Sequence, residues 1–129
     1  AIGRAIEEQD IERIVQTDIE FHELLYQAAR NERLLVIIGN LREQLTRFRT
    51  ISMSYPGRLK ATLEEHRAIV DAIGAGDARY ARKVGAKHME NSEQTLLHAI
   101  EEQEQKTGKT LVKRKNKKTK GSTPSCSVS

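Results

Sequence analysis

The chain has 129 residues with 22 Lys+Arg and 18 Asp+Glu, which gives a formal net charge of +4. This length suits one domain. No apolar run approaches the ~20 residues that a membrane-spanning helix needs, and the N-terminal segment lacks the apolar stretch of a secretory signal. We therefore expect no membrane contact, and the single Cys126, which has no cysteine partner in the chain, favours a cytoplasmic location.

The positive charge is concentrated at one end of the chain. From Gln105 onward there are eight basic residues and no acidic one, whereas the preceding part has 14 basic and 18 acidic residues and a net charge of −4. Residues 105–129 contain few apolar side chains, so we predict a basic, disordered tail after a folded domain over 1–104. A nucleic-acid contact through these lysines is the alternative, although no aromatic ring accompanies them for base stacking.

Apolar residues recur at helical spacing almost everywhere, and no stretch alternates as a half-buried strand does. This pattern predicts an all-α, antiparallel helical bundle. The first two helices are expected over 1–8 and 11–29, with Asp10 capping the second. Asn31 is a suitable N-cap for a third helix over 32–53.

Turn residues separate the later helices. The segment Tyr55-Pro56-Gly57 should end the third helix, because Pro lacks an amide donor and Gly tolerates a positive φ. Thr62 and Glu65 then have the spacing of a capping box, which predicts a helix from there to Ile73. After the glycines at 74 and 76, Asp77 should cap a last helix that ends near Glu104.

Three of the four histidines share helix faces with apolar residues and are expected to point inward: His22, His66 and His88. His98 has polar neighbours and is expected to face solvent. Asp18 precedes His22 by one turn, so both side chains lie over one surface patch. A buried carboxylate needs a partner, and a divalent cation held by three imidazoles would provide one, with Zn²⁺ favoured and Ni²⁺ or Mn²⁺ as alternatives. The other interpretation is that each histidine is an ordinary packed core residue.

Catalytic motifs are weak by comparison. His22 and Glu23 begin like HExxH, but the fifth position is Tyr26 rather than a second histidine. The arginines at 42, 47 and 49 in the third helix are candidate partners for an anionic ligand, because a guanidinium matches a carboxylate. They could equally form surface pairs along that helix.

Several short elements together resemble a known family. They are a D-x-x-F-H element at 18–22, an A-x-N-x-x-L element at 29–34, an E-H-x-x-I element at 65–69, Ala72-Ile73, Gly76-Asp77-Ala78, and His88 placed 22 residues after His66. Their order and spacing resemble the FCD domain, the C-terminal effector-binding domain of FadR-type transcriptional regulators in the GntR superfamily. The resemblance spans about residues 5–100.

The resemblance implies a dimerising helical bundle that binds a small organic acid in a central cavity. It places a divalent metal on Asp18, His22, His66 and His88, and it makes Arg47, Arg49 and Asn91 candidates for binding the effector. In such regulators a winged helix-turn-helix domain binds DNA. We expect that domain, the initiator Met and the first helix of the family domain to be missing here, so any DNA contact would belong to the parent protein.

Three functions stay open at this point. The first is a metal-containing domain that senses a carboxylate without turnover. The second is a helical metal-dependent hydrolase or lyase that uses the same four ligands to activate water. The third is a plain helical dimerisation module with packed histidines.

Overall fold

The computed structural model describes the backbone of residues 10–119 and the side chains of residues 10–108. All the regular secondary structure in this part of the chain is α-helical, which confirms the predicted all-α class. Its helices are α2 (Ile11–Ala28), α3 (Glu32–Asn40), α4 (Arg42–Met53), α5 (Arg58–Gly74) and α6 (Ala78–Thr119). None of them combines the length and the apolar character that crossing a membrane requires. The helix expected over 1–8 lies outside the described residues.

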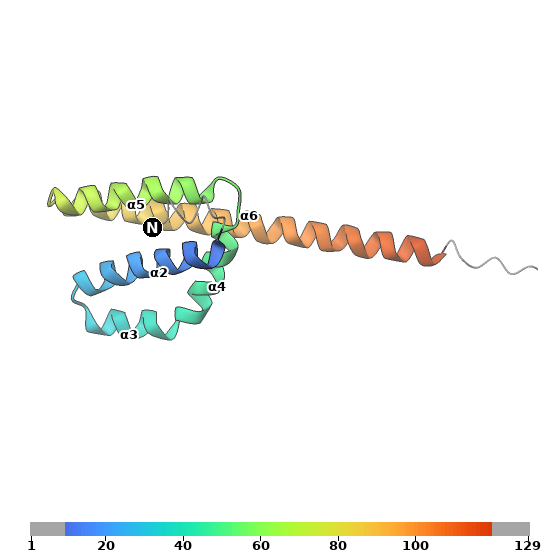
Figure 1. Cartoon of the computed structure of the whole chain (residues 1–129), viewed down its shortest axis with the longest axis horizontal. Coiled ribbons are helices and arrows are strands. Elements are labelled where there is room, and N and C mark those ends of the chain that lie inside the picture. Colours follow the sequence, from blue (N-terminus) through green and yellow to red (C-terminus); the bar gives the residue numbers. More distant parts are fainter. Residues whose placement is uncertain (1–9, 120–129) are drawn as a thin grey trace, which may run out of the picture.

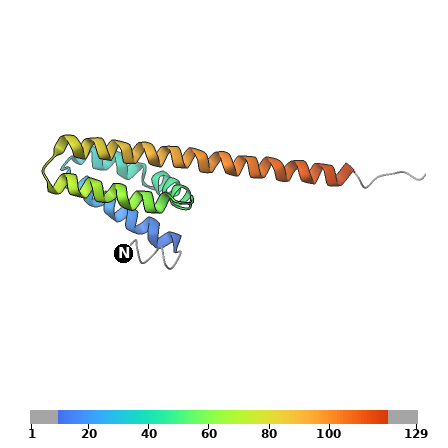
Figure 2. The same cartoon turned by 90° about the horizontal axis from the view of Figure 1, so that it is seen from above.

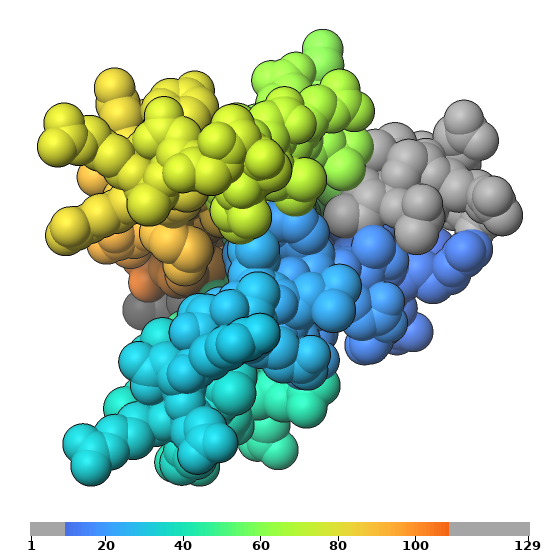
Figure 3. Space-filling view, turned by 90° about the vertical axis from the view of Figure 1, so that its left-hand side faces the viewer, coloured from blue at the N-terminus to red at the C-terminus, as the bar shows by residue number. Residues whose placement is uncertain are grey.

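The helices pack as a bundle in which α4 contacts each of the others. Helices α5 and α6 form an antiparallel pair, and α2 lies between this pair and α3 (Figures 1 and 3). Helix α4 closes one end, where it contacts α2, α5 and α6. The bundle therefore brings one face each of α2, α5 and α6 toward a common interior.

Three of the four predicted N-caps are confirmed. Asp10 Oδ1 accepts from the amide of Arg13 at 3.2 Å, and the Asn31 side chain accepts from the amide of Leu34 at 3.1 Å. Asp77 Oδ1 accepts from the amide of Tyr80 at 3.0 Å. Each bond satisfies an amide that the first turn of a helix leaves without a backbone partner.

The single helix predicted over 32–53 is wrong. The chain changes direction at Leu41, which separates α3 from α4 (Figure 1). Leu41 has φ −97° and ψ 0°, and its amide bonds to the carbonyl of Ile38. Gly39 and Asn40, which are poor helix formers, immediately precede this break, and the apolar periodicity hid their effect.

The capping box predicted at Thr62 and Glu65 is also wrong. Helix α5 begins at Arg58, with Gly57 at φ 81° in the capping position. Thr62 therefore lies inside the helix and is 1% exposed. Glu65 pairs with Arg58 rather than with a backbone amide, because the turn before the helix ends earlier than the box required.

Helix α6 extends well past the end predicted near Glu104. It continues to Thr119 and projects beyond the bundle (Figures 1 and 2). Residues 105–119 are therefore helical rather than disordered, since a helix can propagate outward from a packed segment through residues such as Lys and Gln that favour it. The division into a folded domain over 1–104 and a basic tail stays a prediction, and the end of that tail lies outside the described residues.

The interior is unusual in its chemistry. Among the described side chains, seven apolar ones are buried, with Ile14, Val15, Ile19 and Met53 forming one cluster. Seven polar or charged ones are equally buried: Asp18, His22, Ser52, Arg58, Thr62, His66 and His88. Because buried polar groups cost free energy unless they are paired, this half of the interior requires a separate explanation.

Candidate metal centre and ligand cavity

Four of these buried groups meet at one point inside the bundle. Helix α2 contributes Asp18 and His22, α5 contributes His66, and α6 contributes His88, with 3–7% of each residue exposed. The three histidines expected to face the interior do so, and the exposed His98 is also as expected. Convergence of the three helices therefore brings together residues up to 70 positions apart in the sequence.

The donor atoms are close enough to share one ion. One ligand atom from each of the three histidines lies within 4.8 Å of the others. Nε2 of His66 is 3.3 Å from Nε2 of His88, and Asp18 Oδ1 is 3.4 Å from Nε2 of His66 and 3.7 Å from Nε2 of His22. A tetrahedral zinc ion with ligands at about 2.0–2.1 Å separates its ligand atoms by about 3.3–3.4 Å. The donor set fits such an ion with small adjustments.

Asp18 supplies the clearest sign of a missing partner. Its Oδ2 atom pairs with Nε of Arg49 at 3.2 Å, but its buried Oδ1 atom has no hydrogen-bond partner. Burial raises the pKa of this carboxyl, and the charge of Arg49 offsets the increase only in part. A cation beside Oδ1 would stabilise the ionised form and satisfy the orphaned oxygen.

His22 and His66 are held in the neutral form that metal binding requires. Burial, followed by the charge of Arg49, lowers the pKa of His22 to about 3. Burial, followed by the charge of His88, lowers the pKa of His66 to about 4. The ring of Phe21 stacks on that of His66 with centroids 3.9 Å apart, which restricts the rotation of the imidazole. At neutral pH both rings therefore offer lone pairs rather than positive charge.

A second group of residues orients His88. Nδ1 of His88 lies 2.8 Å from Oε1 of Glu65, and since an ionised carboxylate only accepts, Nδ1 carries the proton. Arg58 donates to both Glu65 oxygens at 2.7 and 3.1 Å, and Asn91 donates to Oε2 at 3.0 Å. Burial alone would raise the pKa of Glu65, but these hydrogen bonds outweigh it and lower the pKa. The network thus leaves Nε2 of His88 free to face the other ligands.

The donor cluster borders a cavity of about 540 Å³. Asp18, His22 and His88 form one side of its wall, and Arg49, Arg58 and Thr62 line it as well. The remaining wall includes the apolar residues Leu45, Phe48, Met53, Ala86, Met89 and Leu96. This combination of a few polar groups and a mainly apolar wall is typical of small-molecule sites.

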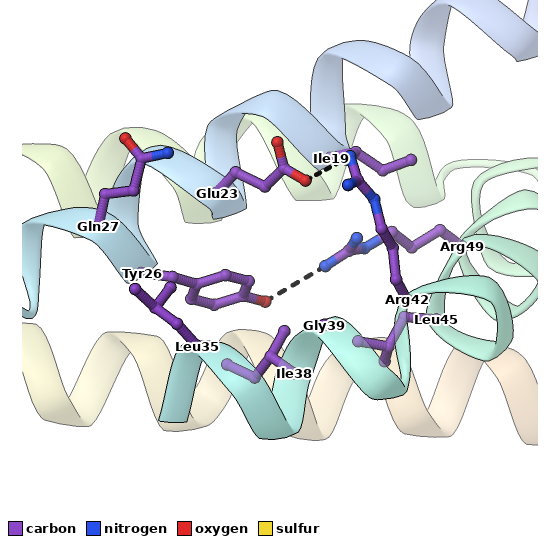
Figure 4. Close-up of a pocket in the computed structure, with 10 residues that line it drawn as sticks. All are labelled: Ile19, Glu23, Tyr26, Gln27, Leu35, Ile38, Gly39, Arg42, Leu45 and Arg49. Carbon is purple, nitrogen blue, oxygen red and sulfur yellow. Dashed lines mark hydrogen bonds and ion pairs between the residues drawn. The ribbon is translucent and has the colours of Figure 1, made fainter. Parts of the chain in front are cut away.

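A second cavity, of about 320 Å³, lies between α2, α3 and α4. Tyr26, Leu45 and Arg49 line both cavities. Figure 4 shows Tyr26 and Arg49 pointing toward each other, and an Arg49 nitrogen donates to the Tyr26 hydroxyl at 3.3 Å. Glu23 and Arg42, which also line this cavity, form an exposed ion pair at 2.6 Å. The two cavities therefore share a wall of three side chains.

A family model described as the FCD domain matches residues 1–91, more than two thirds of the chain. The chain belongs to the FCD-domain family. No curated protein and no solved structure matches the chain. The match covers Asp18, His22, His66 and His88, and it agrees with the all-helical bundle. It supports an effector-binding domain of a GntR-family regulator.

The structure separates the predicted effector-binding residues of this FCD domain. Arg49 lies beside Asp18 in the cavity wall. Arg47 is exposed and lines neither cavity. Asn91 also lies outside both linings and bonds to Glu65. Arg49 is thus the predicted effector residue that the fold brings to the metal-ligand cluster.

Sequence reasoning missed three residues of this FCD site: Arg58, Glu65 and Thr62. Thr62 and Glu65 were assigned to a capping box and Arg58 lay before the predicted helix, because the start of α5 was placed too late. A signal was present, since Arg58, Thr62 and His66 are spaced by four residues and share one face of a helix. A helix start at Arg58 would have placed Arg58 and Thr62 on the same helix face as the predicted ligand His66.

Proposed function

We propose that this FCD domain is a metal-dependent sensor of a small carboxylate, within a transcriptional regulator of the FadR type. The observation that supports it best is the orphaned Oδ1 atom of buried Asp18, surrounded by neutral imidazoles. Asp18, His22, His66 and His88 would hold a divalent ion, Zn²⁺ before Ni²⁺ or Mn²⁺. The bound metal would act as a Lewis acid that anchors a carboxylate oxygen.

Arg49 would supply the second contact to the carboxylate. Its guanidinium is already desolvated in the cavity wall, with 17% of the side chain exposed. An arginine fork matches a carboxylate in geometry and charge. Arg58, in contrast, is committed to Glu65 and to Ser92 Oγ at 2.8 Å, so we assign it a positioning role.

The regulator would work through a homodimer and without turnover. An acid that binds one arrangement of the dimer more tightly shifts the population toward that arrangement. DNA contact would belong to a winged-helix domain of the parent protein, and the location would be cytoplasmic. Recovery of the bound acid unchanged after incubation would support sensing, whereas a new product would support the hydrolase or lyase alternative.

The carboxylate that contacts the ligand cluster is a poor general base for hydrolysis. A metal-dependent hydrolase needs a carboxylate or imidazole free to accept a proton from water. Glu65 is the carboxylate that contacts a candidate ligand, His88, but both of its oxygens already accept hydrogen bonds from Arg58. Its lowered pKa makes it a still weaker base.

Metal content and thermal unfolding test the site. The chain, purified without chelators, should contain about one zinc per molecule, and adding zinc to stripped protein should raise the Tm because the ion binds the folded state. His66→Ala should abolish both effects, whereas the matched variant His98→Ala, at an exposed position, should retain them. A zinc-independent Tm in a chain with native helicity would refute the site and favour the packed-histidine alternative.

A further inference from the structure

Thr62 carries a buried hydroxyl group for which the protein provides no partner. The residue is 1% exposed, the lowest value among the described residues that are buried, and its Oγ1 atom forms no hydrogen bond. Thr62 also lines the 540 Å³ cavity beside Asp18. A buried hydroxyl without a partner is costly, so its position at a cavity wall requires an explanation.

Threonines in the other helices show which hydrogen bond this hydroxyl could have formed. A helical Thr commonly donates to the carbonyl four residues earlier. The other helical threonines with described side chains all do so, at 2.9–3.0 Å: Thr17, Thr46, Thr50, Thr95 and Thr107. Thr62 departs from this pattern at the position where the helix faces the cavity. Its hydroxyl therefore keeps its hydrogen-bonding capacity unused.

The spacing of residues along α5 shows where this hydroxyl lies relative to the candidate metal ligand His66. Thr62 precedes His66 by four residues and follows Arg58 by four, so the three side chains lie along one helix face about 6 Å apart along the axis. Arg58 is already bonded to Glu65 and Ser92. Thr62 is thus the group on this face that retains unused hydrogen-bonding capacity, about one turn from His66.

We propose that Thr62 is a specificity residue that hydrogen-bonds a second oxygen of the bound acid. This inference rests on the proposed function, because the carboxylate is taken to lie at the metal ligands and Arg49. The domain would then prefer a monocarboxylate that carries a hydroxyl group over the same acid without one. Glu90 and Glu93 also line the cavity, and their negative charges disfavour a second carboxylate on the ligand.

Calorimetric titration of the zinc-loaded full chain tests the preference. The probes are butanoate, its 2-, 3- and 4-hydroxy derivatives, and butanedioate. The wild type should bind at least one hydroxybutanoate about fivefold more tightly than butanoate, as expected for one net hydrogen bond, and should bind butanedioate more weakly than that hydroxybutanoate. Thr62→Val should remove the preference without weakening butanoate binding, and Thr62→Ser should restore it.

A second readout requires no ligand. Because the Thr62 hydroxyl is unsatisfied, Thr62→Val should leave the Tm of the ligand-free chain unchanged or raise it. The matched variant Thr95→Val removes a hydroxyl that does have a partner, and it should lower the Tm while leaving the ligand preference intact. A lower Tm for Thr62→Val would mean that the hydroxyl is structural and would overturn the inference.

The possible titration results separate the two proposals. If all the monocarboxylates bind equally well to the wild type, or if Thr62→Val keeps the preference, the role of Thr62 is refuted but carboxylate sensing stands. If no acid binds to zinc-loaded wild type, both are refuted. If the acids bind equally with and without zinc, the metal anchor is refuted, whereas a preference lost in Thr62→Val would still support the role of Thr62.

Discussion

The carboxylate of Glu65 lies 2.8 Å from Nδ1 of His88, and this contact determines which ring nitrogen of His88 remains available. Because Nδ1 donates to Glu65, the lone pair resides on Nε2, 3.3 Å from Nε2 of His66. Partners of this kind orient metal-binding imidazoles and increase their basicity. Glu65 is therefore a positioning residue for the candidate metal centre.

Glu65→Gln should weaken zinc binding by about 10–100-fold, the range typical for loss of such a partner. The amide keeps the size of the side chain but removes the charge that fixes the proton on Nδ1. Competition with a chromogenic zinc chelator measures the affinity, and circular dichroism verifies the fold. Glu64→Gln, the same change at the neighbouring exposed position, should bind zinc as the wild type does. Equal affinities for the two variants would refute the positioning role.

Acid should destabilise the metal-free chain. The pKa of His22 is lowered to about 3 and that of His66 to about 4, from 6.5. Between pH 6.5 and 4 the unfolded chain therefore binds protons that the folded chain does not, so the free energy of unfolding decreases as the pH falls. Asp18, whose pKa burial raises from 3.8, acts in the opposite direction at the lower end of this window.

Thermal unfolding at a series of pH values measures this effect. The Tm of stripped protein should fall steadily across the window. His22→Asn should make the fall shallower, because one of the two responsible groups is gone. His98→Asn should leave it unchanged, since that residue is exposed. A flat wild-type profile would contradict the burial of neutral histidines.

The small apolar cluster should be sensitive to truncation. Ile14 is 4% exposed and packs with Val15, Ile19 and Met53. Ile14→Ala should lower the free energy of unfolding by about 2–5 kcal/mol, the usual cost of such a cavity. Val36→Ala on α3, where the side chain is 64% exposed, should change it by less than about 0.5 kcal/mol. Chemical denaturation of the zinc-loaded chain compares the two variants.

The projecting part of α6 should be dispensable for the bundle. Figure 2 shows it extending away from the other helices, and the residues at 105–108 are exposed. A chain that ends at Gly108 should therefore keep the Tm and the zinc affinity of the full chain. A large drop in either quantity would show that the basic segment contributes to the folded domain.

The sequence was informative where periodicity and capping chemistry act locally. The helices are capped as predicted by Asp10, Asn31 and Asp77, because a short polar side chain just before a helix accepts a hydrogen bond from an amide of its first turn. The inward direction of His22, His66 and His88 also followed from their helix faces. These predictions depend on neighbouring residues rather than on how the helices pack.

The predictions that failed depend on interactions between distant segments or on weak local signals. The break at Leu41 depends on two poor helix formers inside an otherwise continuous stripe. The start of α5 depends on Gly57 adopting a positive φ rather than on the capping-box spacing of Thr62 and Glu65. The contact between Glu65 and His88 joins two helices, so no pattern along one of them could reveal it.

The wall between the two cavities has a thermodynamic consequence. Arg49 is bonded to Asp18 on the side of the candidate metal ligands and to Tyr26 on the side of α3. A ligand that moves the guanidinium of Arg49 away from Asp18 would also change the hydrogen bond between Arg49 and Tyr26. Because both side chains line the smaller cavity, the shape of that cavity would change as well. If each cavity binds a ligand, linkage requires that any effect of one ligand on the affinity of the other be equal in both directions.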